Sequence, residues 1–85
     1  MRMEWEREAW SRYSLSFVAV WKYVDRDSDE PMWALISVYD KEHTRKDSYR
    51  YCVMVTRAGG PVRWFKTLVG ARRYVEREHI KYLFD

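Results

Sequence analysis

The side chains that most often carry catalysis are few and scattered in this chain. His43 and His79 lie in different segments, and Cys52 is the single cysteine. His79 falls on an apolar stripe, where a histidine is typically a core residue, and no neighbouring feature activates Cys52 as a nucleophile. The chain has no nucleophile-elbow, P-loop or dinucleotide-binding motif. We therefore expect no catalysis and no cofactor.

An acidic run resembles a calcium loop only at its start. Asp25, Asp27 and Asp29 match the first three ligand positions. The sixth position, which needs glycine, is Glu30, and the twelfth, which needs glutamate, is Ile36. We therefore expect no metal site here, and interpret the run as a charged hairpin tip.

Basic side chains offer a stronger chemical pattern. Arg73, Arg77 and Lys81 follow one another at i, i+4 along the C-terminal segment, so a helix would place them on one side. Residues 1–40 contain five basic and eight acidic side chains, whereas residues 41–85 contain eleven and five. Such asymmetry indicates a polyanionic partner or head-to-tail self-association, unless the fold brings the two halves together and they neutralise each other.

Two functions from different classes fit these observations. The leading hypothesis is a small intracellular, cytoplasmic protein that binds nucleic acid, with phosphate contacts and one stacking ring supplied by Arg73, Arg77, Lys81, Lys46, Arg50 and Tyr49. The alternative is a protein–protein interaction module, either a small phage-type inhibitor or a homodimer. Its anchors would be the aromatic residues Trp21, Trp33, Tyr39 and Tyr51.

The elements that must position these residues form one small α+β domain over residues 1–85. The patterning predicts a short N-terminal helix over Met1–Tyr13, because Trp5, Ala9 and Tyr13 share i, i+4 spacing. Short connections favour an antiparallel meander of three or four strands. The predicted strands cover residues 14–24, 32–40, 49–57 and 62–65. Thr67 is expected to cap a helix that runs from there close to the C-terminus.

Alternation along the strands predicts two apolar sheet faces. One would be aliphatic and include Val20, Ile36 and Met54; the other would be aromatic and include Trp21 and Tyr51. We expect the aliphatic face under the C-terminal helix, because small side chains allow close approach, although the reverse assignment is open. The aromatic face would then be covered by the N-terminal helix, a second copy or a partner.

The C-terminal helix should pack through the stripe Leu68, Ala71, Val75, His79 and Tyr82. Gly70 lies on the opposite side, where glycine costs up to about 1 kcal/mol relative to alanine. We expect Gly70→Ala to stabilise the fold. Either a partner approaches closely at Gly70, or a position near the helix start tolerates glycine cheaply.

The string Trp64-Phe65-Lys66-Thr67-Leu68, with Ala71, resembles the strand-to-helix junction of phage-integrase arm-binding domains and plant AP2-type domains. Those domains insert a sheet into the DNA major groove. The helix–three strands–helix order also resembles double-stranded RNA-binding domains, but their lysine cluster at the second helix is missing. These are likenesses of topology, which do not carry function, and we assign no family. No stretch approaches the roughly 20 apolar residues of a membrane helix.

Overall fold

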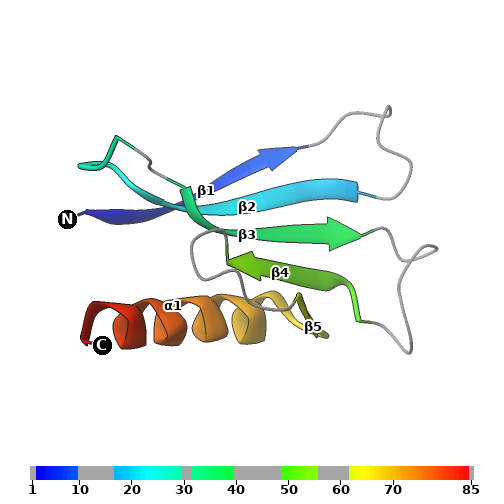
Figure 1. The fold of residues 1–85 in the computed structure, drawn as a ribbon. Coiled ribbons are helices and arrows are strands. Elements are labelled where there is room, and N and C mark those ends of the chain that lie inside the picture. The colour runs from blue at the N-terminus through cyan, green and yellow to red at the C-terminus, as the bar shows by residue number, and fades with distance from the viewer. Residues whose placement is uncertain (1, 10–16, 30–31, 40–48, 56–61, 85) are drawn as a thin grey trace.

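Five antiparallel strands and one C-terminal helix make up the described part of the chain (Figure 1). The computed structural model describes residues 2–9, 17–29, 32–39, 49–55 and 62–84. The sheet order is β1-β2-β3-β4-β5, so each strand pairs with its neighbour in sequence. The elements are β1 (Met3–Ala9), β2 (Phe17–Asp25), β3 (Met32–Tyr39), β4 (Tyr51–Val55), β5 (Arg63–Phe65) and α1 (Leu68–Phe84). The predicted α+β meander with a C-terminal helix is therefore confirmed.

The predicted N-terminal helix is wrong over Met3–Ala9, which forms strand β1, and the sheet has five strands rather than three or four. β1 pairs with β2 along its whole length, from Met3 opposite Asp25 to Ala9 opposite Ala19. The spacing between Trp5 and Ala9 is compatible with both a helix and a strand, because four residues are about one helical turn and also two strand repeats. The regular alternation of Glu4, Glu6 and Glu8 with their neighbours is the strand signal. Residues 1 and 10–13 of the predicted helix lie outside the described residues.

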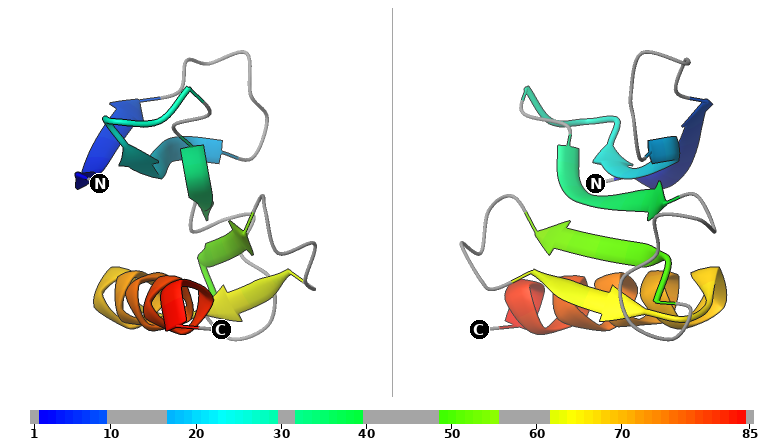
Figure 2. Two further views of the ribbon diagram at one scale, coloured as in Figure 1. Left: turned by 60° about the vertical axis from the view of Figure 1, so that its left-hand side comes forward. Right: turned by 90° about the vertical axis from the view of Figure 1, so that its right-hand side faces the viewer.

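Helix α1 lies across one face of the sheet at the β4–β5 end, and β1 forms the opposite edge (Figure 2). It packs against β3, β4 and β5. Ala71, Val75 and His79 are the buried residues of its inner stripe, as the 3.6-residue period predicts. Tyr82, the last member of the predicted stripe, is half exposed. The core beneath the helix centres on the fully buried side chains of Ile36, Val53 and Val75.

The predicted division into an aliphatic and an aromatic face is wrong. Trp21 pairs with Ile36, and Ile36 pairs with Val53, so these three residues share the helix-covered face. Two register shifts in the β2–β3 pairing leave one extra residue on each strand, Val18 on β2 and Trp33 on β3. A one-residue slip moves every side chain of a strand to the other face. The alternation could therefore be predicted only between these two extra residues, and the register between neighbouring strands could not.

The predicted N-cap of α1 is confirmed. The Gly70 backbone N–H donates to Thr67 Oγ1 at 3.0 Å, which satisfies one of the free donors of the first turn. A Cβ added to Gly70 would lie 3.0 Å from that same oxygen and 3.7 Å from Phe65 Cδ1. Glycine at this position therefore leaves room for the cap, which is a structural reason for its presence that needs no partner.

This crowding changes the expectation for Gly70→Ala. In the wild-type chain, the gain in helix propensity of up to about 1 kcal/mol is offset by displacement of the capping hydroxyl. In a Thr67→Ala chain, which itself loses about 1 kcal/mol, the hydroxyl is gone and Gly70→Ala should give its full gain. Urea unfolding of the four proteins of this cycle measures the coupling. Equal effects of Gly70→Ala in both backgrounds would show that the cap does not need the space.

Candidate functional site

The outer side of α1 carries unpaired positive charge. Arg73, Arg77 and Lys81 are all exposed. Lys81 Nζ lies 3.8 Å from Glu78 Oε1, an exposed pair of small energetic value. Within the described part of the chain, Arg73 and Arg77 form no ion pair with a carboxylate. The helix therefore holds two free guanidinium groups one turn apart, as the i, i+4 spacing predicts.

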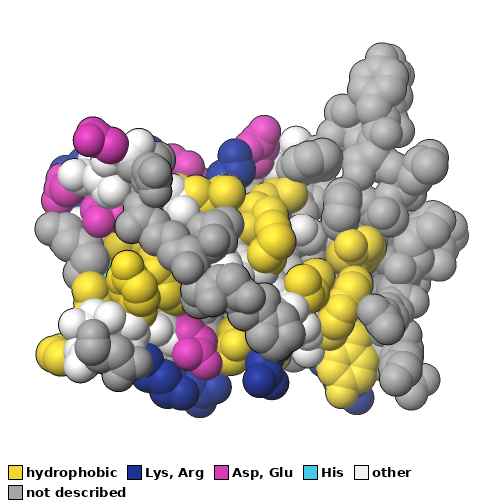
Figure 3. Space-filling model, in the orientation of Figure 1, with side chains coloured by type: hydrophobic (Ala, Val, Ile, Leu, Met, Phe, Trp, Pro, Cys, Tyr) yellow, Lys and Arg dark blue, Asp and Glu magenta, His cyan; other side chains and the backbone are white. Residues whose placement is uncertain are grey.

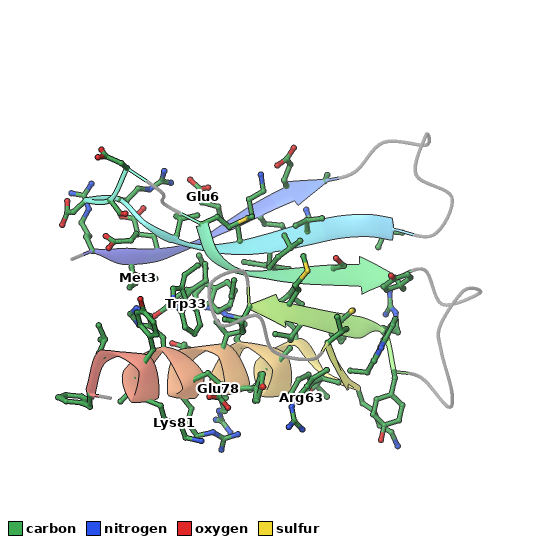
Figure 4. All side chains as sticks on the ribbon, in the orientation of Figure 1. Met3, Glu6, Trp33, Arg63, Glu78 and Lys81 are labelled. Carbon is green, nitrogen blue, oxygen red and sulfur yellow. The ribbon has the colours of Figure 1, made fainter. Side chains whose placement is uncertain are left out.

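Strand β5 adds a further cation to the same side. The guanidinium carbon of Arg63 lies 5.6 Å from the ring centroid of Tyr74, and that ring lies 5.3 Å from the ring of Phe65. Tyr74, Arg77 and Lys81 are spaced at i, i+3 and i+7 and so share one side of α1. Figure 4 shows Arg63, Glu78 and Lys81 along the same edge of the molecule. Arg63 therefore extends the helical cations onto the sheet edge.

A second pair of cation and ring lies where β4 begins and β5 ends. Lys66 Nζ lies 5.1 Å from the ring centroid of Tyr49. Tyr49 is half-buried and Lys66 is exposed. We call the whole surface the basic–aromatic strip and define it by Tyr49, Arg63, Lys66, Arg73, Tyr74, Arg77 and Lys81. Basic side chains of this strip are visible along α1 and β5 in Figure 3.

Arg50 is predicted as a phosphate contact, but the structure ties it into the sheet. Its Nε donates to the Tyr39 carbonyl oxygen at 3.1 Å, and its own carbonyl oxygen accepts from the Tyr39 N–H at 2.8 Å. Its guanidinium carbon also lies 5.9 Å from the ring centroid of Tyr51. Arg50 is therefore a half-buried link between β3 and β4 and is not grouped with the free cations. Lys46, the remaining predicted contact, lies outside the described residues.

The carboxylates of the N-terminal half pair with cations of that same half. Arg26 Nε lies 2.9 Å from Glu4 Oε2, and Arg26 also forms an ion pair with Glu6. Lys22 Nζ lies 2.8 Å from Glu8 Oε2. In the described residues, no ion pair joins the acidic half to the basic half. The carboxylates of Glu4, Glu6 and Glu8 are thus neutralised within their own half.

The four predicted protein-binding anchors do not form one exposed face. Trp33 is only 4% exposed, and Tyr51 packs against the core. Trp21 is half-buried beneath Arg72, whose guanidinium carbon lies 5.4 Å from its ring centroid. Tyr39 lies 5.0 Å from the ring of Trp64, which pairs with Cys52 and so is on the sheet face away from α1. The structure therefore divides these rings between the core and the two sheet faces.

His79 lies in the core, and Asp25 ends β2 at the turn that follows it. His79 is 5% exposed, and its ring lies 4.9 Å from that of Trp33 and 5.6 Å from that of Tyr23. Desolvation by this burial lowers the pKa of His79. Asp25 Oδ1 accepts from the backbone N–H groups of Arg2 and Asp27, which lowers the pKa of its carboxyl. The described residues contain no group of three side chains able to hold a metal ion, and His43 lies outside them.

Sequence reasoning did not select Tyr74, Arg63 or Lys66 for the site. Arg63 begins the last strand and Lys66 follows it, so their charge could be recognised in the sequence, but the side of the sheet on which they lie could not. Tyr74 precedes Arg77 by three residues and Lys81 by seven, and this spacing was the one signal that could have identified it.

Comparison with protein-family models, curated proteins and solved structures gives no match to this chain. No helix in the described part of the chain has both the length and the apolar character needed to cross a membrane.

Proposed function

We propose that this protein binds nucleic acid through the phosphate backbone, using the basic–aromatic strip. The observation that carries this proposal is the segregation of charge. The carboxylates of β1 are occupied by Lys22 and Arg26, while Arg73 and Arg77 have no carboxylate partner in the described structure. A phosphate can therefore approach Arg73 and Arg77 without first breaking an ion pair.

The placement of these cations suits a polyanion. Arg73 and Arg77 project from one rigid helix about 6 Å apart along its axis, since each residue advances about 1.5 Å. Arg63 and Lys66 continue the positive charge along β5 towards the start of β4. Guanidinium groups bind phosphate oxygens in a two-pronged geometry, and each neutralised phosphate releases condensed counterions. Glu76 and Glu78 on the same helix reduce the local charge without removing it.

The test is fluorescence anisotropy with labelled DNA and RNA at about 50 and 200 mM salt, a range over which phosphate-driven binding weakens strongly. We expect Arg73→Ala with Arg77→Ala to weaken binding and to reduce the slope of log affinity against log salt by about 1.4 to 1.8, because about 0.7 to 0.9 is lost per phosphate contact.

The matched control removes the same net charge from the opposite part of the molecule. Lys22→Ala with Arg26→Ala should leave the salt slope unchanged, because these cations already pair with Glu8, Glu4 and Glu6. Equal losses in both double variants would mean that net charge alone drives binding. Absence of binding at the lower salt concentration would refute the proposed function.

A further inference from the structure

The basic–aromatic strip contains two tyrosine rings, each with a cation over it. Lys66 lies over Tyr49 at 5.1 Å, and Arg63 lies over Tyr74 at 5.6 Å. Both rings are half-buried, so each is held by the fold and still reaches the surface. Phosphate binding alone does not need such rings, because cations on a helix suffice for it. Tyr74 packs against the core, and its half-exposed ring still reaches the surface beside free cations.

Tyr74 is the better-defined of the two rings. It is fixed on one side of α1 by Phe65, whose ring lies 5.3 Å away at an interplanar angle of 41°. Arg63 and Phe65 are two residues apart on β5, so both project to the same side of the strand and both reach Tyr74. The rings of Tyr74 and Phe65 and the guanidinium group of Arg63 thus lie together. Tyr74 shares its side of α1 with Arg77 and Lys81.

Nucleic-acid bases stack on tyrosine rings and on guanidinium planes, but only when the bases are unstacked from their own duplex. A duplex presents phosphates and groove edges, and hides the faces of its bases. We infer that the ligand of the strip is single-stranded nucleic acid. Its bases stack at Tyr74 beside Arg63 and at Tyr49 beside Lys66, and its phosphates bind Arg73 and Arg77. This inference rests on the proposed nucleic-acid binding and specifies its substrate class.

The experiment compares a labelled single strand of about 20 nucleotides with its own duplex, both titrated with the full chain at low salt. The wild-type protein should prefer the single strand. Tyr74→Leu and Tyr49→Leu remove the ring and keep an apolar side chain and the net charge. Each should reduce the ratio of single-strand to duplex affinity by about 5- to 160-fold, the usual effect of removing one stacking ring.

Two further variants separate stacking from folding. Tyr74→Phe keeps the ring and should retain the single-strand preference. Phe84→Leu removes a ring that is 84% exposed at the end of α1, outside the strip, and should also retain it. Thermal unfolding of each variant, followed by circular dichroism, verifies that the titrated protein is folded.

The outcomes distinguish the two proposals. Equal affinity for single strand and duplex, or Leu variants that keep the wild-type ratio, would overturn the stacking inference and leave phosphate binding standing. Absence of binding to both ligands would overturn the proposed function and the inference with it.

Discussion

Replacing Trp33 by alanine is expected to lower the free energy of unfolding by about 3 to 5 kcal/mol, the cost of removing a buried large aromatic side chain. Trp33 is only 4% exposed. Its ring lies 4.9 Å from His79, 6.1 Å from Tyr82 and 6.4 Å from Tyr23, and so joins the end of α1 to the sheet. Alanine would leave a cavity between these rings, and the loss of these ring contacts adds to the cost of the cavity.

Chemical denaturation monitored by circular dichroism measures this loss. Phe84→Ala is the matched control, because it also removes an aromatic ring from the same end of the molecule. Phe84 is 84% exposed, so its loss should change stability by less than about 0.5 kcal/mol. If Trp33→Ala were as mild as Phe84→Ala, Trp33 would be a surface residue and would again qualify as a protein-binding anchor.

Stability is expected to fall as the pH decreases from about 6.5, because His79 is buried between aromatic rings in its neutral form. Its pKa is lowered in the folded state, so the unfolded chain binds the proton more tightly. The stability gained by burying neutral His79 is therefore fully present above the ordinary histidine pKa and is lost progressively as the pH falls below it. Asp25, the charged group of β2 that acts on His79, opposes this effect by favouring the imidazolium form. The rings of Tyr23 and Trp33 pack against His79.

Urea midpoints measured between about pH 5 and pH 7.5 test this expectation, since this range brackets the histidine titration. His79→Phe keeps a ring in the cluster and removes the titrating group, so its stability should be nearly flat over the same range. Asp25 does not contribute to the pH dependence of stability in this range. The pKa of its carboxyl is lowered from 3.8, so the stability that depends on its charge is lost only at more acidic pH. A pH dependence that persists unchanged in His79→Phe would show that another group is responsible.

The local elements of this fold follow directly from the sequence. The C-terminal helix, its Thr67 cap and the core position of His79 could be predicted, because capping chemistry and the 3.6-residue period depend on neighbours within about one turn. The four predicted strands also form where the β-branched and aromatic residues cluster. The N-terminal segment could not be assigned as readily, since the spacing of its apolar residues suits a helix and a strand alike.

The arrangement of the faces was decided by tertiary structure. Which side chains share a face depends on the register between neighbouring strands, and the extra residues Val18 and Trp33 also change the alternation at the two ends of the β2–β3 pairing. Such bulges arise from pairing between distant residues and leave no periodic signal in either strand. Trp33 could therefore be recognised as a strand residue from the sequence, but its burial under α1 could not.

The candidate site could likewise be predicted only in part from the sequence. The spacing and composition of the chain were enough to predict that Arg73, Arg77 and Lys81 lie along one helix, and that the C-terminal half is basic. Only the fold decided that Lys22 and Arg26 occupy the carboxylates of β1, and that Tyr74 meets Arg63 from β5. Charge and helical spacing are properties of nearby residues, whereas ion pairing and ring contacts join residues that only the folded sheet brings together.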